Sequence, residues 1–290
     1  MPAVIIDGKA IGCAIREDAR LQTAALRRNG IVPCLAVVLA GEDPASLSYV
    51  AAKGKALAEA GMEGRDYRLP ADVSQDALLG LIEQLNADTK VHGILTQLPL
   101  PKHIDESKVL CAINPSKDVD GFHPVSVGNM VLGRPGFLPC TPHGVLALLR
   151  SLGIRLSGAH AVVVGRSNIV GKPLACLLAR RDVNATVTVC HTGTLNLERH
   201  TLQADILIAA AGKPSLITAA MVRPGAAVID VGVNRVADPS AKSGYRLCGD
   251  VDCAVAEKAA YITPVPGGVG PMTIAMLMSN VVQAAQGVAK

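Results

Sequence analysis

The sequence predicts an α/β protein made of two domains, and three observations lead to this prediction. Continuous apolar runs, typical of strands covered on both faces, alternate with segments of helical spacing along most of the chain. A stretch rich in Gly, Pro, Asp and Asn at 114–142 separates two such series. The length of 290 residues leaves room for two domains of modest size. We therefore expect a first domain at 1–140, completed by a C-terminal helix at 272–290, and a second domain at 141–271.

The first series begins with helical spacing at 7–29. The run at 34–40 is apolar throughout and predicts a strand buried on both faces. The helix expected next has start and stop signals, with Asp43 as its cap, Pro44 at its first position and Gly61 at its end.

Short strands at 65–69 and 91–95, with a helix at 74–87 between them, continue the alternation and favour a parallel sheet covered by helices. A helix at 143–151 opens the second series. The apolar runs of that series lie at 161–164, 186–190, 205–211, 227–231 and 260–263. The last helix, at 272–286, is apolar on most of its circumference, so we expect it to be buried.

The composition excludes several classes of protein. Two Phe, four Tyr and no Trp disfavour a base-stacking platform for single-stranded nucleic acid. The net charge of +4 comes without a basic run that would indicate a nucleic-acid or membrane surface. We expect neither a signal peptide nor a membrane span, which needs roughly 18 apolar residues. Eight cysteines without a Cys-x-x-Cys pair favour reduced thiols in the cytoplasm over a zinc site or disulfides.

A strand, a glycine turn and a helix follow one another around Gly165, which predicts a phosphate site at the helix N-terminus. The dinucleotide fingerprint itself is absent, because the next glycine is Gly171. Arg166 stands where a cation can reach a phosphate. The next strand ends at 190–194 without the carboxylate that would hold the ribose 2′-hydroxyl of NAD. Arg166 with Thr192 therefore favours NADP, the alternative being that Arg166 is a solvated surface charge.

Ser46, Tyr49 and Lys53 share one face of the helix that follows Asp43, within an arc of roughly 60° at about 100° per residue. Tyr49 and Lys53 are neighbours one turn apart. A lysine on a partly apolar face can be desolvated, which makes it useful as an acid or a base. The alternative is that Lys53 extends into water and Tyr49 only packs.

Three polar residues and one loop complete the candidate site. Gln97 follows the strand at 91–95, at the end where open α/β sheets present ligand groups, although it could equally bond the loop backbone. Asp118 and Asp120 share a turn that lacks the further oxygen ligands of a calcium loop, so we expect no metal, and either one could simply make turn hydrogen bonds. The Gly- and Pro-rich loop at 263–273 lets the backbone approach a flat ligand, or it only returns the chain to the first domain.

Taken together, seven ordered segments resemble one family. They are Ser46-Leu47-Ser48-Tyr49-Val50-x-x-Lys53, GILTQLPLP at 93–101, DVDGFHP at 118–124, PCTPHG at 139–144, VVVGRSNIVGKP at 162–173, DVGVNR at 230–235 and YITPVPGGVGPMT at 261–273. The sequence is similar to the bifunctional methylenetetrahydrofolate dehydrogenase/methenyltetrahydrofolate cyclohydrolase family, the FolD type. The resemblance runs from 5–11 to the last helix.

The resemblance implies oxidation of 5,10-methylenetetrahydrofolate to 5,10-methenyltetrahydrofolate with NADP, followed by hydrolysis to 10-formyltetrahydrofolate at the same site. It implies that Lys53 is the catalytic lysine, that Gln97 contacts and tunes it, that Tyr49 lines the pterin side and that Asp120 holds the polar edge of the pterin. The further residues that it assigns to the folate are Leu98, Pro266, Gly267, Gly268, Val269 and Gly270. The residues that it assigns to NADP are Gly165, Arg166, Ser167, Thr192 and Val233.

The family also implies a catalytic domain and a Rossmann-like NADP-binding domain with a cleft between them, and a homodimer. This sequence departs from the family pattern in having Thr192 where Ser is usual and Val233 where Ile is common, which bears on the strength of the NADP preference. Two other readings stay open at this point. One is an NADP-linked dehydrogenase of an amino acid or a shikimate-like acid, and the other is a nucleotide-binding sensor without chemistry.

Overall fold

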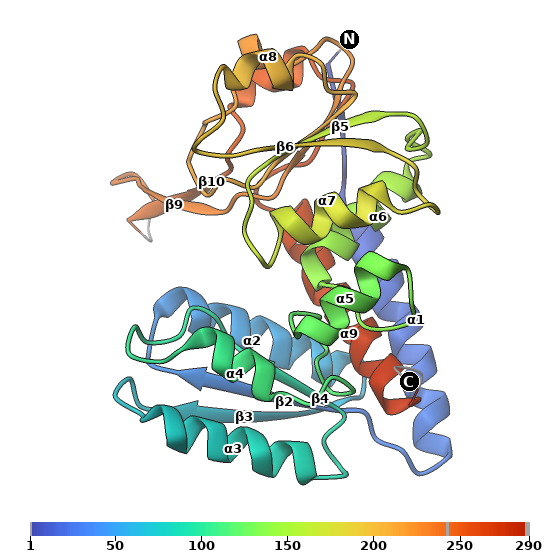
Figure 1. The fold of residues 1–290 in the computed structure, drawn as a ribbon, viewed down its shortest axis with the longest axis vertical. Helices are drawn as coiled ribbons and strands as arrows, with labels where there is room; N and C mark the ends of the chain where they lie inside the picture. The colour runs from blue at the N-terminus through green and yellow to red at the C-terminus, as the bar shows by residue number, and fades with distance from the viewer. Residues whose placement is uncertain (1, 242–243, 288–290) are drawn as a thin grey trace. The chain divides into compact units, whose positions relative to one another are not determined.

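The computed structural model describes residues 2–241 and 244–287, which form two compact units (Figure 1). Unit 1 joins the N-terminal segment up to Gly12 to Thr141–Thr273, and unit 2 joins Cys13–Cys140 to the segment that starts at Ile274. Both units are α/β, and each contains a parallel sheet, as the sequence predicted. Within the described residues, no helix is long and apolar enough to cross a membrane.

The N-terminal residues differ from the expectation, because the sequence placed them in the first domain. Strand β1 (Val4–Ile5) pairs in parallel with β11 (Tyr261–Ile262), so the first residues of the chain complete the sheet of the second series. A strand of only two residues is too short to show a hydrophobic periodicity in the sequence, and its partner strand β11 lies far along the chain.

Unit 2 is built on a three-stranded parallel sheet of order β3-β2-β4. Its elements are α1 (Gly8–Arg28), which begins in the N-terminal segment, β2 (Cys34–Ala40), α2 (Pro44–Glu59), β3 (Glu63–Leu69), α3 (Gln75–Ala87), β4 (Gly93–Thr96), α4 (Glu106–Ala112), α5 (Pro124–Leu132) and α9 (Val269–Ala285). Every residue of β2 is buried, because β2 is the central strand and both of its faces are covered.

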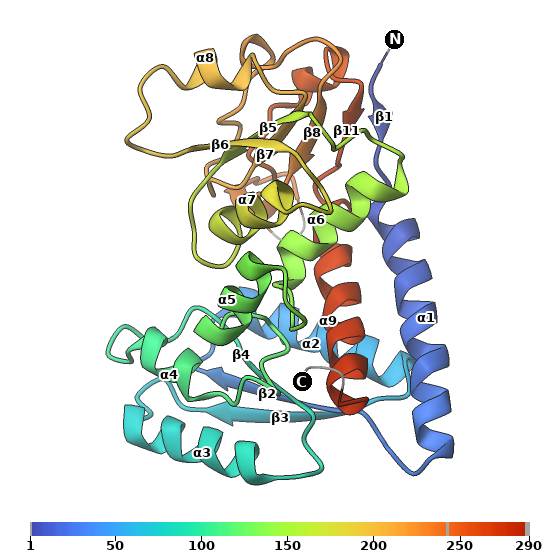
Figure 2. The ribbon, with the colours of Figure 1, turned by 45° about the vertical axis from the view of Figure 1, so that its right-hand side comes forward.

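The two faces of β2 pack against different helices. Alternate residues from Cys34 to Ala40 join Leu78, Ile82 and Val109 in one apolar cluster, so α3 and α4 cover one face. Helix α2 lies over the opposite face, as Figure 2 shows. It begins as predicted: Asp43 accepts the Ser46 N–H at 2.8 Å and Pro44 is the first helical residue.

Unit 1 contains a six-stranded parallel sheet of order β1-β11-β8-β7-β5-β6. Its strands beyond β1 and β11 are β5 (His160–Val164), β6 (Thr186–Cys190), β7 (Ile206–Ala209) and β8 (Ala227–Asp230), together with an antiparallel hairpin of β9 (Asn234–Ala237) and β10 (Tyr245–Cys248). Its helices are α6 (Cys140–Ser151), α7 (Gly171–Ala179), α8 (Leu197–Thr201), and the 3₁₀ turns η1 (Ala219–Met221) and η2 (Cys253–Glu257). Each of the five apolar runs predicted for the second series contains one of the sheet strands.

The strand order creates a switch point in the sheet of unit 1. From β5 the chain crosses to β6 on one side and then returns to β7 on the other side of β5. Open α/β sheets bind ligands outside the carboxyl ends of their strands at such a point. The fold therefore places the candidate nucleotide site at the ends of β5 and β7.

Candidate functional site

Lys53 is held in a largely buried position on α2, in unit 2. Only 8% of its surface is exposed, and its Nζ donates a hydrogen bond to Gln97 Oε1 at 3.0 Å. Gln97 follows β4 directly, and its backbone N–H extends the sheet by bonding Val38 O at 2.8 Å. Its side-chain Nε2 also bonds Leu98 O at 2.8 Å. Gln97 thus does both things that the sequence left open, since it contacts the lysine and satisfies the loop backbone.

Tyr49 lies one turn before Lys53 on the same helix and is 40% exposed. Its ring is therefore not enclosed in the core. Ser46, on the same face, is buried. The helix presents an aromatic surface next to an enclosed amine.

The two aspartates of the 118–124 turn have different surroundings. Asp118 is buried and its carboxylate accepts hydrogen bonds from Ser126 Oγ at 2.7 Å and from His123 N at 2.8 Å. Burial raises the pKa of Asp118 to about 6, and these hydrogen bonds oppose the rise. Asp118 therefore makes the turn hydrogen bonds that the sequence offered as the alternative for either residue.

Asp120 instead faces the lysine. Burial raises the pKa of Asp120 to about 6, while the positive charge of Lys53 lowers it and the negative charge of Asp118 raises it further. The thiol of Cys140 is hydrogen-bonded to the Asp120 carboxylate. The structure thus brings Lys53, Gln97 and Asp120 together in unit 2, with Tyr49 one turn away.

Two residues that support the site, Asn280 and Cys140, were not identified from the sequence. Asn280 on α9 is buried, and its Nδ2 donates to Val119 O at 2.8 Å and to Leu138 O at 3.0 Å. These bonds fix the backbone next to Asp120 and Cys140. The signal was present, because a polar side chain in the middle of an otherwise apolar helix is rarely buried without a specific partner.

The residues predicted to hold the cofactor all follow carboxyl ends of parallel strands in unit 1. Gly165 follows β5, Thr192 follows β6 and Val233 follows β8. Thr192 and Arg166 are exposed, and Val233 is 45% exposed. The loop after β6 is held by a hydrogen bond from His191 N to Thr194 Oγ1 at 2.8 Å. Its residues at 190–194 include no carboxylate.

Two glycines let the strand, the turn and the helix approach one another closely at the switch point. A Cβ on Gly165 would collide with the carbonyl oxygen of Ala210, and a Cβ on Gly171 would collide with the carbonyl oxygen of Gly165. Gly165 also has a φ of 134°. This close approach of strand, turn and helix is what the glycines of a dinucleotide fingerprint provide. The residues present therefore fit a dinucleotide, although their spacing differs from the usual pattern.

Ser167 has a local structural role in the same turn. Its Oγ accepts the N–H of Val170 at 3.1 Å at the start of α7. The exposed Arg166 has no ion-pair partner among the residues that the structure describes. Arg166 is therefore available to an external anion, whereas Ser167 orders the turn.

The Gly- and Pro-rich loop is packed against the start of α1. A Cβ on Gly8 would collide with the carbonyl oxygen of Gly268, and Gly267 has a φ of 111°. Pro266 is exposed. Helix α9 begins at Val269, three residues earlier than the predicted start at 272, so Val269 and Gly270 form its first turn rather than part of the loop.

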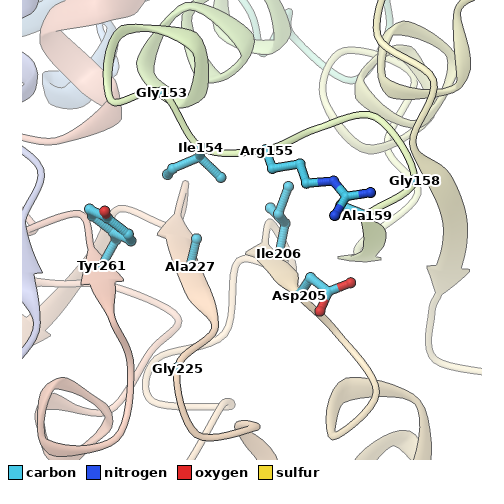
Figure 3. Close-up of a pocket in the computed structure, with 10 residues that line it drawn as sticks. All are labelled: Gly153, Ile154, Arg155, Gly158, Ala159, Asp205, Ile206, Gly225, Ala227 and Tyr261. Carbon is cyan, nitrogen blue, oxygen red and sulfur yellow. The ribbon is translucent and has the colours of Figure 1, made fainter.

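A separate pocket of about 400 Å³ lies at the opposite edge of the same sheet (Figure 3). Its lining includes Arg155 and Asp205, and Ile206, Ala227 and Tyr261 at the amino ends of β7, β8 and β11. Ligands of open α/β sheets bind at the carboxyl ends. This pocket holds none of the predicted site residues, and we assign the nucleotide to the other edge.

Comparison with known proteins identifies the family. The family model of the tetrahydrofolate dehydrogenase/cyclohydrolase catalytic domain matches residues 6–120, and that of the NAD(P)-binding domain matches residues 139–289. The bifunctional protein FolD of Syntrophus aciditrophicus is 56% identical over 99% of this chain and 98% of its own.

Two solved structures are similar over nearly the whole chain. The FolD enzyme of Campylobacter jejuni has a TM-score of 0.93 at 49% identity, covering 98% of this chain and 99% of its own. The Trypanosoma brucei enzyme, solved with NADP and an inhibitor, has a TM-score of 0.94 at 43% identity, covering 99% of this chain and 98% of its own. The chain belongs to the tetrahydrofolate dehydrogenase/cyclohydrolase family.

Proposed function

We propose that this protein oxidises 5,10-methylenetetrahydrofolate to 5,10-methenyltetrahydrofolate with NADP and hydrolyses the product to 10-formyltetrahydrofolate. The observation that carries the proposal is the enclosed Lys53 amine, bonded to Gln97 and facing Asp120, in a chain of this family. A dehydrogenase of another acid would need a site for the carboxylate of its substrate, and a sensor would not need these three side chains together with Tyr49.

NADP, when bound, accepts the hydride from the folate. We assign its phosphates to the Gly165 turn, because the two glycines bring the start of α7 against the end of β5 and backbone N–H groups at a helix N-terminus favour anions. Arg166 and Thr192 would hold the 2′-phosphate, since both are exposed and no carboxylate competes. Ser167 would keep the turn in shape, and the exposed Val233 would provide apolar contact.

Hydrolysis needs a group that moves a proton near the one-carbon unit. Water that attacks the cationic methenyl carbon must lose both of its protons: one is taken up by N5 as the bond from that carbon to N5 breaks, and the other is released to solvent. Lys53 Nζ is suited to carry such a proton, because Gln97 Oε1 fixes its direction and burial keeps bulk water away. Asp120 would accept hydrogen bonds from the pterin, and Tyr49 would lie against the ring.

The remaining parts of the proposal concern the folate loops and the assembly. We assign the substrate contacts beyond Lys53 to Leu98 and to the loop residues Pro266, Gly267, Gly268, Val269 and Gly270. We further propose a homodimer and a cytoplasmic location. All eight cysteines are free thiols, which supports a reducing compartment. Light scattering on the purified protein tests the dimer.

An initial-rate assay tests the function. Reduction of NADP with 5,10-methylenetetrahydrofolate, and loss of methenyl absorbance when methenyltetrahydrofolate is added alone, would establish both activities. We expect faster reduction of NADP than of NAD. Folded protein that binds NADP but performs neither step would contradict the proposal and favour the sensor, and activity on another acid would favour a different dehydrogenase.

A further inference from the structure

Two buried aspartates lie at the carboxyl edge of the sheet of unit 1, and the mechanism above does not use them. Asp230 is the last residue of β8 and is 4% exposed, while Asp250 follows β10 and is fully buried. Burying carboxylates is costly, and apolar pairs often serve stability equally well. A buried pair at a ligand-binding edge therefore calls for an explanation beyond stability.

The carboxylate of Asp250 joins two loops that follow neighbouring strands. Its Oδ2 accepts the backbone N–H of Ala211 at 2.7 Å and of Gly212 at 2.8 Å, in the loop after β7. Its Oδ1 accepts Asn234 Nδ2 at 2.9 Å, directly after the loop that contains Val233. One oxygen thus holds the backbone of the loop after β7, and the other holds the side chain of Asn234 at the end of the loop after β8.

Asp230 holds Asp250 in place. Its Oδ1 accepts the N–H of Asp250 at 2.9 Å and of Gly232 at 3.0 Å, and its Oδ2 accepts the N–H of Val251 at 3.0 Å. The Thr263 hydroxyl, at the start of the Gly- and Pro-rich loop, accepts the Asp230 N–H at 2.7 Å. Asp230 therefore links the loops after β8 and β11 to the segment that carries Asp250.

Two glycines let the backbone approach these carboxylates closely. A Cβ on Gly232 would collide with the Asp250 carboxylate, and a Cβ on Gly249 would collide with the Asp230 carboxylate. The loop that Asp250 holds also reaches the phosphate turn, because the carbonyl oxygen of Ala210 is the atom that a Cβ on Gly165 would meet. A continuous set of contacts runs from Asp250 to the Gly165 turn.

We propose that Asp250, supported by Asp230, is a positioning residue of the cofactor site that sets the loops after β7 and β8 in the shape that NADP requires. This inference rests on the proposed function, in that it takes Gly165 and Val233 to border NADP. It predicts a defect in cofactor binding that leaves hydrolysis of methenyltetrahydrofolate intact, since hydrolysis uses no cofactor and Lys53, Gln97 and Asp120, the polar side chains assigned to it, lie in unit 2.

The test is the variant Asp250→Asn. In this variant one acceptor oxygen becomes an NH₂ group, which then faces the N–H donors that the oxygen had bonded. We expect the Kd for NADP, measured by calorimetry, and the KM for NADP to rise tenfold or more, with hydrolysis within twofold of the wild type. Asp252→Asn is the matched control, because Asp252 only accepts the Ala254 N–H at 2.9 Å, and an amide oxygen can replace that acceptor. The Kd of the Asp252→Asn variant for NADP should equal that of the wild type.

The outcomes separate the inference from the proposed function. Wild-type protein that binds no NADP contradicts the proposed function itself. An Asp250→Asn variant that binds NADP as the wild type does, or one that loses binding and hydrolysis to the same degree, overturns the inference. If that variant does not fold, Asn234→Ala removes one partner of Asp250, together with the longer bond from Asn234 Nδ2 to Cys248 O, and leaves the Asp250 carboxylate in place. A severalfold rise in its Kd with hydrolysis retained supports the inference, and an unchanged Kd overturns it.

Discussion

Lys53 and Lys55 lie two residues apart on α2 in opposite environments, which provides a matched pair of variants. Lys53 is enclosed and bonded to Gln97, whereas the Lys55 side chain is 80% exposed. Lys53→Met keeps the length of the side chain but removes the proton carrier, so we expect hydrolysis of methenyltetrahydrofolate to fall by about 10²–10⁴-fold. Lys55→Met should retain full activity. A folded Lys53→Met variant that hydrolyses at the wild-type rate would remove Lys53 from the mechanism.

The carboxyl of Asp120 makes substrate binding dependent on pH. Burial raises its pKa to about 6, with Lys53 opposing the rise, so Asp120 is ionised at pH 7.5 and gains a proton as the pH falls through 6. Only the ionised form is fully able to accept hydrogen bonds from the pterin. We therefore expect kcat/KM for the folate to fall about tenfold per pH unit below 6.

The variant Asp120→Asn separates this titration from others in the protein. The pKa of Asp118 is also raised to about 6 by burial, but its carboxylate is held by the turn. In Asp120→Asn we expect a lower kcat/KM at pH 7.5 and no decline near pH 6. A decline that persists in this variant would assign the titration to Asp118 or another group.

The two aspartates also show what the sequence can and cannot determine about single residues. The resemblance singled out Asp120, but residue spacing alone left both aspartates as candidates, because a turn and a substrate site use the same side chain. Only the hydrogen bonds of the fold distinguish them. Cys140 and Asn280 were missed for a related reason, since their contacts join parts of the chain 140 residues apart.

At the level of elements, the two edges of the unit 1 sheet provide another comparison. Arg166 lies at the carboxyl edge and Arg155 at the amino edge, in the pocket of Figure 3. Arg166→Ala should raise the KM for NADP about tenfold or more, because a hydrogen bond to a charged group is lost, and should leave the KM for NAD nearly unchanged. Arg155→Ala should change neither constant. An unchanged preference for NADP over NAD in Arg166→Ala would refute the role of Arg166.

Elements with strong periodicity or clear caps were predicted, and those without were not. The strand at 34–40 and the helix after Asp43 are confirmed. Helix α5 was missed within the Gly- and Pro-rich stretch, because its cap is His123, whose Nδ1 accepts the Val125 N–H at 3.0 Å, and histidine is not a usual capping residue. The β9–β10 hairpin was missed because its strands have four residues each and are only half-buried.

At the level of the whole molecule, folding links distant segments through strand pairing and buried polar groups. The β1–β11 pair joins the N-terminal residues to Tyr261 and Ile262, and the bonds of Asn280 join the last helix to the middle of the chain. Such pairings leave no local pattern in the sequence. The domain boundaries at 12 and 273 therefore follow from the structure, whereas the break near 140 was visible in the composition.

Buried titratable groups make the stability of the protein depend on pH in opposite directions. Burial raises the pKa values of Asp118, Asp120 and Asp230 to about 6, so the folded state binds these protons more tightly than the unfolded state and gains stability as the pH falls towards 4. His143 acts in the other direction. Burial, assisted by the charges of Arg150 and Arg180, lowers its pKa from 6.5 to about 4.

The contribution of His143 can be isolated by comparing the wild type with His143→Met. Between pH 6.5 and 4 the unfolded state binds a proton at His143 that the folded state does not, so stability is lost as the pH falls through this range, by up to about 3 kcal/mol. The aspartates contribute equally to both proteins and cancel in the difference. We therefore expect the thermal midpoint of His143→Met to rise relative to the wild type between pH 7 and pH 4.5. A difference in midpoint that stays constant across this range would show that His143 titrates alike in both states.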